Sequence, residues 1–444
     1  MRRTTLLSTA FVGLSLGLAA WQPASAQNPG LNARIAQLSA QQQDQVVAWR
    51  RDFHQHPELG NEETRTAGIV AAHLRKLGLE VKTGVGRTGV VGILRGGKPG
   101  RVVALRADMD ALPVTEATGL AFASTVKTTY LGQPVGVMHA CGHDSHTAIL
   151  MGVAEVLSQV KKDLPGTVKF IFQPAEEGSL PGEEGGAKLM VKEGVLENPK
   201  VDAIFGLHIQ AQTEVGKLTY RPGGEMASSD RFTVKVLGKG SHGAKPWSSV
   251  DPVVTAAQII LGLQTIVSRQ TDLTEDAAVV TVGTVKAGVR YNVIPAEAEL
   301  SGTIRAFNRK TQEQLWAAIR RTAKGIAESA GATAEVGIEP YVPVTFNDLP
   351  LTARMLPTLQ AVAGGADNVK EIKAVTGAED FAFYQEKVPG LYFFLGGLKK
   401  GVDAASTADH HTSGFVIDES GFTLGVKALA TLAADYLGSE GRKK

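Results

Sequence analysis

Three apolar segments of this sequence are each followed at once by carboxylate or imidazole side chains. The segments span residues 102–106, 167–172 and 201–207, and their length and apolar character predict buried β-strands. The polar residues directly beyond them are Asp108 and Asp110, Glu176 and Glu177, and His208. In open α/β folds the carboxyl ends of the strands line the ligand crevice. One loop acid or one strand-end histidine is ordinary, but three such sets together favour an α/β domain whose central, mostly parallel sheet carries a site at one edge.

A different order of elements occupies residues 229–338. Alternating and helical patterns there predict strand, helix, strand, strand, helix, strand, which is the ferredoxin-like arrangement. Gly223-Gly224 before it, and Glu339-Pro340 with Pro343 after it, are expected hinges. A chain of 444 residues also exceeds the usual size of a single core. We therefore predict a large domain interrupted by a small one, with these bounds: a polar N-terminal arm or leading helix at 27–44, the large catalytic domain at 45–223 and 336–444, and the inserted lid domain at 224–335.

The stretch from Met138 to Thr147 holds the single cysteine and three of the ten histidines. Cys141 and His143 stand two residues apart, and a thiolate and imidazoles this close repel or compete unless a metal binds them. A lone cysteine is more often a buried structural residue, but the local density favours a metal site. Asp144 and His146 are expected to orient this loop or cap the helix that follows, and His139 is a possible neighbour of the ligands.

Five residues across the chain form the candidate ligand set: Cys141, His143, Glu177, His208 and His411. Five ligands exceed what one ion needs if positions stay open for water and substrate. Two ions about 3.5–4 Å apart that share a ligand would use the set better and suit a hydrolytic reaction. The mixture of sulfur, nitrogen and oxygen suits Zn²⁺, Mn²⁺, Co²⁺ or Ni²⁺ and does not suit Mg²⁺ or Ca²⁺.

Glu176 and Glu177 are neighbours, so their side chains point in different directions. One of the two would bind metal, and the other would be free to act as the general base toward a metal-activated water. Asp108 can orient a ligand. For Asp110, such a supporting role and that of a plain turn acid are equally favoured by the sequence.

The small domain contributes three further candidates, His242 in a glycine-rich loop, Asn292 and Arg305. His242 and Asn292 could donate hydrogen bonds to a polarised carbonyl group. Arg305 could pair with a substrate carboxylate, although its spacing fits a surface strand residue equally well.

The N-terminus has the three parts of a secretory signal peptide. Arg2 and Arg3 supply positive charge, residues 6–21 are apolar, and Ala24-Ser25-Ala26 is a small-x-small cleavage site. The apolar run is shorter than the about 20 residues of a membrane span, so we expect cleavage near Ala26 and export to the periplasm or beyond. Loss of residues 1–26 removes two arginines and no acid, which lowers the formal net charge from +2 to zero. This balance gives no electrostatic reason to expect nucleic acid or a membrane as a partner.

The chain resembles the M20 metallopeptidases, in particular the amidohydrolase branch with hippurate hydrolase, N-acyl-amino-acid amidohydrolases, bacterial carboxypeptidases and auxin-conjugate hydrolases. The resemblance covers about residues 45–440. It rests on these motifs: RADMDALP at 106–113, MHACGHDSHT at 138–147, QPAEEG at 173–178, GLH at 206–208, GKGSHGAKP at 238–246, NVIP at 292–295, GTIRAF at 302–307 and GAEDF at 377–381.

The resemblance implies a role for each candidate residue. It implies a binuclear metal centre with Cys141 as the bridging ligand, Glu176 as the general base and Asp108 as a supporting acid. His242, Asn292 and Arg305 are implied to face the substrate from a lid domain that also forms a homodimer, in which the lid histidine can reach the partner's site. The substrate would be an N-acyl amino acid or a small peptide.

Two positions depart from the family pattern. The last motif reads His411-Thr412-Ser413-Gly414-Phe415 and lacks the usual proline, so His410 competes with His411, and the spacing to Phe415 favours His411. Trp247 stands where many members carry a second histidine, which leaves the substrate preference open.

Two other hypotheses predict different behaviour. A nucleophilic Cys141 with a histidine base would form an acyl-enzyme and ignore chelators, but Cys-Gly-His shows no third group to orient the base. A protein that binds peptide or metal without turnover would not need Glu176. Metal-dependent amide hydrolysis is the leading hypothesis.

Overall fold

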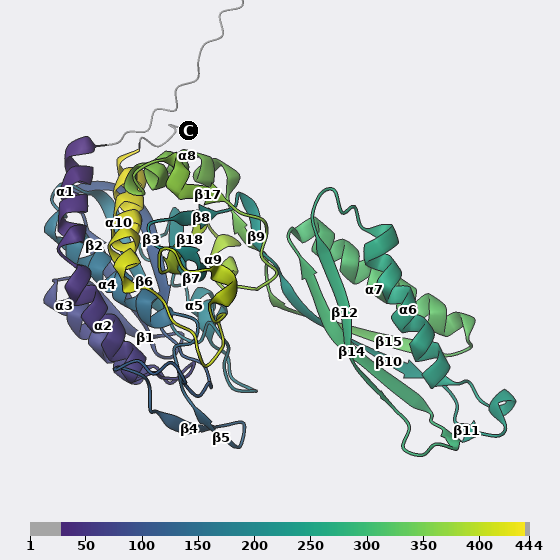
Figure 1. The fold of residues 1–444 in the computed structure, drawn as a ribbon. Helices are drawn as coiled ribbons and strands as arrows, with labels where there is room; N and C mark the ends of the chain where they lie inside the picture. Colours follow the sequence, from purple (N-terminus) through teal and green to yellow (C-terminus); the bar gives the residue numbers. More distant parts are fainter. Residues whose placement is uncertain (1–27, 440–444) are drawn as a thin grey trace, which may run out of the picture.

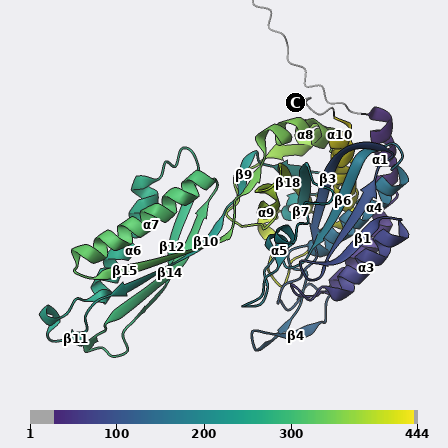
Figure 2. The ribbon, with the colours of Figure 1, turned by 180° about the vertical axis from the view of Figure 1, so that it is seen from behind.

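The computed structural model describes residues 28–439, which form two bodies joined by two neighbouring linkers (Figures 1 and 2). The predicted signal peptide, residues 1–26, lies outside the described residues. We call the body with the large sheet the large domain and the body formed between residues 229 and 342 the small domain.

The large domain is built on a mixed eight-stranded sheet with the strand order β1-β2-β6-β3-β7-β18-β8-β17. Its four central strands, β6, β3, β7 and β18, pair in parallel, which confirms the predicted mostly parallel centre. The strands span the following residues: β1 Glu80–Val85, β2 Gly89–Arg95, β3 Lys98–Asp108, β6 Pro165–Gln173, β7 Ala203–Glu214, β8 Leu218–Tyr220, β17 Val369–Glu371 and β18 Gly390–Leu398.

Both faces of this sheet are covered, so its central strands are apolar on both sides. On β3, Val103 and Leu105 join the core on one face and Ala104 the core on the other. The first core includes residues of α1 (Pro29–Ala40), α2 (Gln43–Gln55), α3 (Thr64–Lys76), α4 (His143–Gln159), α8 (Leu349–Val362) and α10 (Phe422–Gly438). The second includes residues of the short helices α5 (Gly186–Lys192) and α9 (Ala382–Gln385).

Of the two forms expected for residues 27–44, an arm or a leading helix, the structure has a helix. Residues 29–40 form α1, whose Leu31, Ile35 and Leu38 are buried and which packs against α10. Their spacing puts the three side chains on one helix face. The segment is polar overall, so its composition does not indicate this narrow apolar stripe. Because the stripe is buried in the core of the large domain, the segment belongs to that domain.

The small domain has the predicted βαββαβ order and an antiparallel sheet, β12-β14-β10-β15. Its helices α6 and α7 cover one face of the sheet (Figure 1). The elements span the following residues: β10 Ser229–Leu237, α6 Pro252–Gln270, β12 Ala278–Ala287, β14 Glu297–Ala306, α7 Arg309–Ser329 and β15 Thr333–Val342. Among the described helices, α6 is long and apolar enough to cross a membrane by length and composition, yet its Ile259, Leu263 and Ile266 are buried in this domain's core.

The C-terminal boundary of the small domain lies beyond the expected residue 335. Strand β15 continues through Pro340 to Val342, and Pro340 fits because β15 is an edge strand, where a missing amide donor is tolerated. The linkers are β9 (Gly223–Met226) and β16 (Thr345–Asn347), which pair with each other. The hinge expected at Glu339-Pro340 is therefore part of the sheet.

Besides the paired linkers, two short strand pairs lie outside the two main sheets. The strands β4 (Lys127–Tyr130) and β5 (Gln133–Gly136) form a hairpin on the large domain. The strands β11 (Ser241–His242) and β13 (Val293–Ile294) pair at the end of the small domain that lies farthest from the large domain in both views (Figures 1 and 2).

Candidate metal centre and active site

The carboxyl ends of the central parallel strands bring the predicted polar sets to one edge of the sheet. Asp108 is the last residue of β3, and Glu176 and Glu177 lie in the loop just after β6. His208 lies inside β7 instead of beyond it, because β7 continues along β18 after its pairing with β3 ends at Gly206.

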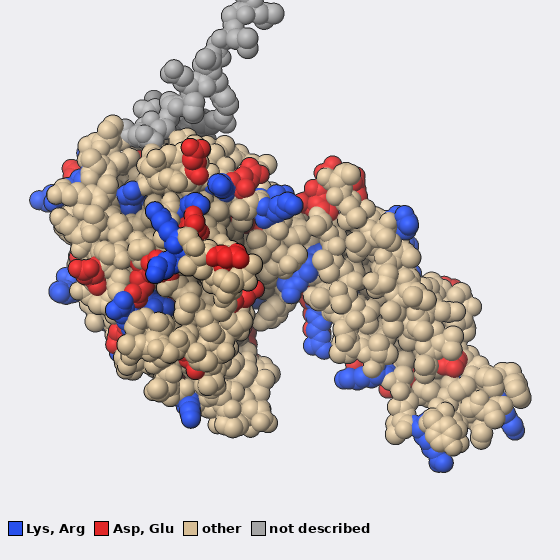
Figure 3. All heavy atoms as spheres, in the orientation of Figure 1, with Lys and Arg blue, Asp and Glu red and all other residues tan. Residues whose placement is uncertain are grey.

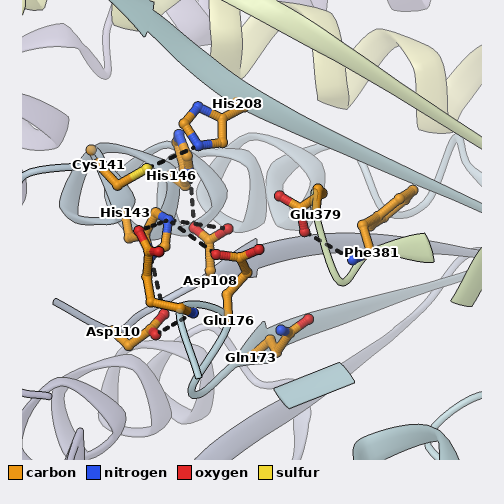
Figure 4. Close-up of polar contacts among 12 residues, drawn as sticks. Asp108, Asp110, Cys141, His143, His146, Gln173, Glu176, His208, Glu379 and Phe381 are labelled. Atoms are coloured by element: carbon orange, nitrogen blue, oxygen red, sulfur yellow. Dashed lines mark hydrogen bonds and ion pairs between the residues drawn. The ribbon is translucent and has the colours of Figure 1, made fainter. Parts of the chain in front are cut away.

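The Cys141–His143 turn is shaped by the glycine between them. Gly142 has φ +99°, and a Cβ at this position would lie 2.3 Å from the Ile209 side chain. Only glycine fits such a close approach in the left-handed region. The turn leads directly into α4, which begins at His143, so Cys141 and His143 both face the sheet edge (Figure 4).

Two groups of donor atoms meet at Cys141. Its Sγ lies 3.4 Å from His208 Nε2 and 3.3 Å from His411 Nε2, and His411 Nε2 lies 3.0 Å from Glu177 Oε1. Donors of Cys141, His143 and His208 lie within 4.8 Å of one another, and so do those of Cys141, Glu177 and His411. The five predicted ligands thus form two triads that share the cysteine.

The donor atoms of these triads fit metal ions. His143 Nε2 is buried without a hydrogen-bond partner among residues 28–439. An orphaned buried polar atom costs about 1–3 kcal/mol, and this nitrogen lies among the donor atoms of the triad with Cys141 and His208. Thiolate, imidazole and carboxylate ligands together match two divalent transition-metal ions sharing one ligand.

Asp110 is the acid that holds a member of the triads. Its Oδ1 lies 3.0 Å from His143 Nδ1, and its Oδ2 accepts a hydrogen bond from the Glu177 amide at 2.9 Å. These bonds direct the opposite nitrogen of His143 toward the other donors. Of the two roles that the sequence left open for Asp110, the structure has the supporting one.

Asp108 lies 3.8 Å from His143 Nε2 through its Oδ2, and its hydrogen bonds go to residues outside the triads. Its Oδ1 lies 2.6 Å from His146 Nδ1, and its Oδ2 pairs with Arg106 at 2.5 Å. His146 Nε2 accepts a hydrogen bond from the Ile209 amide. The His146 ring packs edge-on against the His208 ring, with 4.6 Å between the ring centroids. Both nitrogens of His146 are therefore engaged, and Asp108 supports His208 through that ring.

Glu176 lies beside the triads. Its Oε1 accepts a hydrogen bond from the Asp380 amide at 3.3 Å, and its Oε2 lies 3.9 Å from His143 Nε2. Burial, together with the carboxylates of Glu379, Glu177 and Asp380, raises the pKa of Glu176 well above its usual value. A carboxyl group with a raised pKa holds a proton more readily, as a general acid–base residue needs.

The neighbouring histidines His410 and His411 differ in the partners of their ring nitrogens. His410 Nε2 accepts a hydrogen bond from the Ala211 amide at 3.2 Å, and its Nδ1 lies 3.3 Å from the Cys141 carbonyl oxygen. His411 has φ +63° and turns its Nε2 toward Cys141 and Glu177. The structure thus brings His411 into the triad, as the spacing to Phe415 favoured.

The other polar residues of the Cys/His stretch lie behind it. Asp144 accepts the Ser145 amide and pairs with Arg50 and His54, so it anchors the start of α4. His139 is buried, and neither of its ring nitrogens has a hydrogen-bond partner in the described part of the chain. Burial lowers the pKa of His139 to about 3, so its ring is neutral.

The thiol of Cys141 lacks the environment of a nucleophile. Burial and the nearby Glu177 carboxylate raise its pKa well above the usual value. A catalytic cysteine needs a lowered pKa, supplied by a cation or a helix N-terminus. The thiol-nucleophile hypothesis is therefore disfavoured.

A cleft of about 520 Å³ opens over the two triads, between the two domains (Figure 3). Arg305, on β14 of the small domain, lines it together with Glu176. His242 and Asn292 do not line it, because β11 and β13 lie at the far end of the small domain. Further lining residues that were not among the candidates are Met226, Ser229, Tyr341, Glu379 and Phe394. Glu379 belongs to the GAEDF motif, whereas the other four lie on β9, β10, β15 and β18, where a strand pattern does not distinguish a cleft residue from its neighbours.

Known proteins of one family match most of this chain in sequence. The sequence model of the family described as "Peptidase family M20/M25/M40" matches residues 104–435. Thermostable carboxypeptidase 2 of Saccharolobus solfataricus is 41% identical over 398 residues, which cover 89% of this chain and 96% of that protein. N-acetylcysteine deacetylase of Bacillus subtilis is 39% identical over 393 residues, which cover 88% of this chain and 97% of that protein.

A solved structure extends the likeness to the fold. The crystal structure of the Bacillus subtilis YXEP protein, described as a dinuclear metal-binding peptidase from the M20 family, has a TM-score of 0.74 and 37% identity. It covers 89% of this chain and 98% of its own. Sequence and fold together confirm what the motifs indicated, and the chain belongs to peptidase family M20/M25/M40.

Proposed function

We propose that this protein is a metal-dependent amidohydrolase that cleaves the amide bond of N-acyl amino acids or small peptides. The observation that carries the proposal is the pair of donor triads that share Cys141 directly beneath a cleft also lined by Glu176. The names of its relatives, a carboxypeptidase and an N-acetyl deacetylase, both denote the breaking of amide bonds.

Each triad would hold one divalent transition-metal ion, with Cys141 common to both. Such ions supply Lewis acidity and lower the pKa of water toward about 7. Glu176 takes the proton from the attacking water and returns it to the leaving nitrogen. The Asp380 amide fixes one oxygen of Glu176 while the other faces the triads.

Arg305 is the residue we propose to bind the substrate carboxylate. Its half-buried guanidinium lines the cleft and has no hydrogen-bond partner within residues 28–439. A planar guanidinium can bind a carboxylate through two parallel hydrogen bonds. An amino-acid product would thus be held at its own carboxylate, with the acyl side directed toward Glu176.

We also propose a homodimer formed through the small domain. Strand β12 is a free sheet edge in the monomer, and Val285 on it is 56% exposed. Leu261 on α6 is 71% exposed, and Trp247 and Tyr291 lie open near the tip. Burying these groups against a second copy would stabilise the pair through apolar area and allow His242 and Asn292 to serve the partner's cleft.

We further propose that the chain is exported and cleaved near Ala26. The charged start, the apolar run and the small-residue site support this proposal. N-terminal sequencing of the protein from periplasmic and culture fractions tests it, and a mature protein that begins at Met1 in the cytoplasm would contradict it.

The function is tested with a panel of N-acetyl and N-benzoyl amino acids and dipeptides. Hydrolysis should be lost on chelation and restored by Zn²⁺, Mn²⁺, Co²⁺ or Ni²⁺, with about two ions bound per chain by metal analysis. Full activity in a metal-free preparation would overturn the proposal. A metal-loaded wild type that is inert on the whole panel would instead favour a binding protein without turnover.

A further inference from the structure

A buried carboxyl group behind the catalytic loop has no part in the proposed reaction. It belongs to Glu63, at the start of α3, whose side chain is 0% exposed. Its Oε1 accepts a hydrogen bond from the Ala175 amide at 2.8 Å, and its Oε2 bonds the Thr88 hydroxyl. Ala175 directly precedes Glu176 and Glu177, so Glu63 contacts the loop that carries both.

The loop needs this support because its backbone is unfavourable by itself. Ala175 has φ +50°, in the left-handed region, which costs a residue with a Cβ roughly 1–2 kcal/mol. The loop before α3 also packs tightly against it, since a Cβ on Gly60 would lie 2.4 Å from the Gly178 carbonyl oxygen. Backbone strain of this kind persists only where surrounding contacts hold it.

Two carboxyl groups hold the amides on either side of the proposed base. Glu63 accepts the Ala175 amide, and Asp110 accepts the Glu177 amide at 2.9 Å. Only Asp110 also contacts His143. Removing Glu63 would release one side of the loop while leaving the direct support of His143 in place.

We infer that Glu63 is a positioning residue, which fixes the Ala175 amide and thereby aims Glu176 into the cleft and Glu177 at its triad. This inference rests on the proposed function for the roles of Glu176 and Glu177. Glu63 itself touches neither the cleft nor a member of the triads.

The protonation state of Glu63 suits this task. Burial and the facing Asp110 carboxylate raise its pKa to about 8. A neutral carboxylic acid can accept a hydrogen bond from the Ala175 amide with one oxygen and share a hydrogen bond with the Thr88 hydroxyl, which can donate or accept, through the other. A glutamine has the same shape, one acceptor and one donor, and it should preserve both bonds.

The experiment compares Glu63→Ala, Glu63→Gln and the matched control Glu62→Gln, which alters the exposed neighbouring glutamate. Hydrogen–deuterium exchange of the peptide covering residues 173–178, kcat and KM are measured on each metal-loaded protein. The affinity for Zn²⁺ is measured by titration of each metal-free protein. For Glu63→Ala we expect faster exchange in this peptide and a loss of about 10- to 100-fold in kcat or metal affinity, the usual effect of losing a support of this kind. Glu63→Gln should stay within about twofold of wild type in kcat, because it keeps both hydrogen bonds.

Three results would overturn the inference. These are unchanged exchange and kcat in Glu63→Ala, equal damage in Glu63→Gln and Glu63→Ala, or the same change in Glu62→Gln. A wild type that hydrolyses nothing on the panel would count against the proposed function, while the exchange and Zn²⁺ measurements would still test the role of Glu63.

A second variant covers the case in which Glu63→Ala does not fold. Thr88→Val removes one partner of the carboxyl group and leaves the loop sequence intact. Faster exchange at residues 173–178 and lower kcat are expected, and wild-type values for both would contradict the positioning role.

Discussion

Glu176 is the single side chain on which the proposed chemistry depends most directly. Its carboxyl group faces the triads but is not needed to complete either group of three donors. Glu176→Gln keeps the volume and removes the proton acceptor, so kcat should fall about 10²- to 10⁴-fold while the metal content stays at the wild-type value. Steady-state kinetics together with metal analysis check this. A variant that keeps wild-type kcat would rule out Glu176 as the base.

Arg305 governs binding in the same cleft. Arg305→Met removes the guanidinium that we propose to pair with the substrate carboxylate, at a cost of about 1.5–3 kcal/mol. KM should therefore rise about 10- to 100-fold with little change in kcat. The control is a substrate whose carboxylate is blocked as an amide. If the variant impairs hydrolysis of the blocked substrate as much as that of the free one, Arg305 does not bind the substrate carboxylate.

Glu63 also makes the stability depend on pH. Its pKa is raised from 4.5 to about 8 in the folded chain, so between these values the folded state holds a proton that the unfolded state has released. The stabilisation is fully present below about pH 4.5 and is lost as pH rises through about 8. The melting temperature of wild type and of Glu62→Gln should fall more between pH 5 and pH 8 than that of Glu63→Gln. Parallel curves for all three proteins would show that Glu63 is ionised in the fold.

At the scale of elements, the paired linkers β9 and β16 determine how the small domain is attached. Asn347, at the end of β16, is buried and joins both linkers to the sheet. Its Nδ2 donates to the carbonyl oxygens of Arg221 and Tyr392, each at 2.9 Å, and its Oδ1 accepts the Tyr392 amide at 2.7 Å. The Asn347 amide thus fixes the attachment together with the pairing of β9 with β16.

Asn347→Leu should therefore destabilise the protein severely. It leaves several buried backbone groups unpaired, and we expect a loss of about 3 kcal/mol or more in the free energy of unfolding. The neighbour Asp348 caps α8 through the Leu351 amide, and Asp348→Ala should cost only about 1 kcal/mol. Denaturant titration of the two variants measures the difference, and equal losses would show that Asn347 does not anchor the linkers.

For the whole molecule, we expect activity to depend on dimer formation, because the paired strands β11 and β13 lie at the end of the small domain far from its own cleft (Figure 1). His242 is exposed on β11, away from its own cleft, so in the proposed dimer it serves the partner. His242→Ala and Glu176→Gln should each be nearly inactive alone. Mixed in equal amounts and allowed to exchange subunits, they should recover about a quarter of the wild-type activity, because half of the dimers are mixed and each has one intact site.

Light scattering gives the oligomeric state of each preparation for this experiment. A mixture that recovers no activity although mixed dimers are present would show that His242 does not act across the interface. A monomeric wild type with full activity would exclude the proposed dimer.

The sequence by itself determined which residues are candidates for the chemistry. A cysteine, several histidines and paired acids just beyond buried strands are local signals, and the parallel sheet must bring strand ends to one edge. Local patterns were therefore enough to bring out the ligand candidates and the pair Glu176 and Glu177, while the family resemblance assigned the base to Glu176 and the last ligand to His411. The order of elements in the small domain was also readable, since hydrophobic periodicity reflects one-sided burial along the chain.

Only the tertiary structure decided how those residues share their tasks. That Asp110 holds His143, that Asp108 acts through His146, and that Glu63 supports the loop before Glu176 depend on contacts between segments far apart in the sequence. The same holds for α1, whose apolar stripe has meaning only against α10, and for β15, whose end is fixed by pairing with β10. Sequence patterns record the burial of each segment separately, whereas hydrogen-bond partners are chosen when the segments pack together.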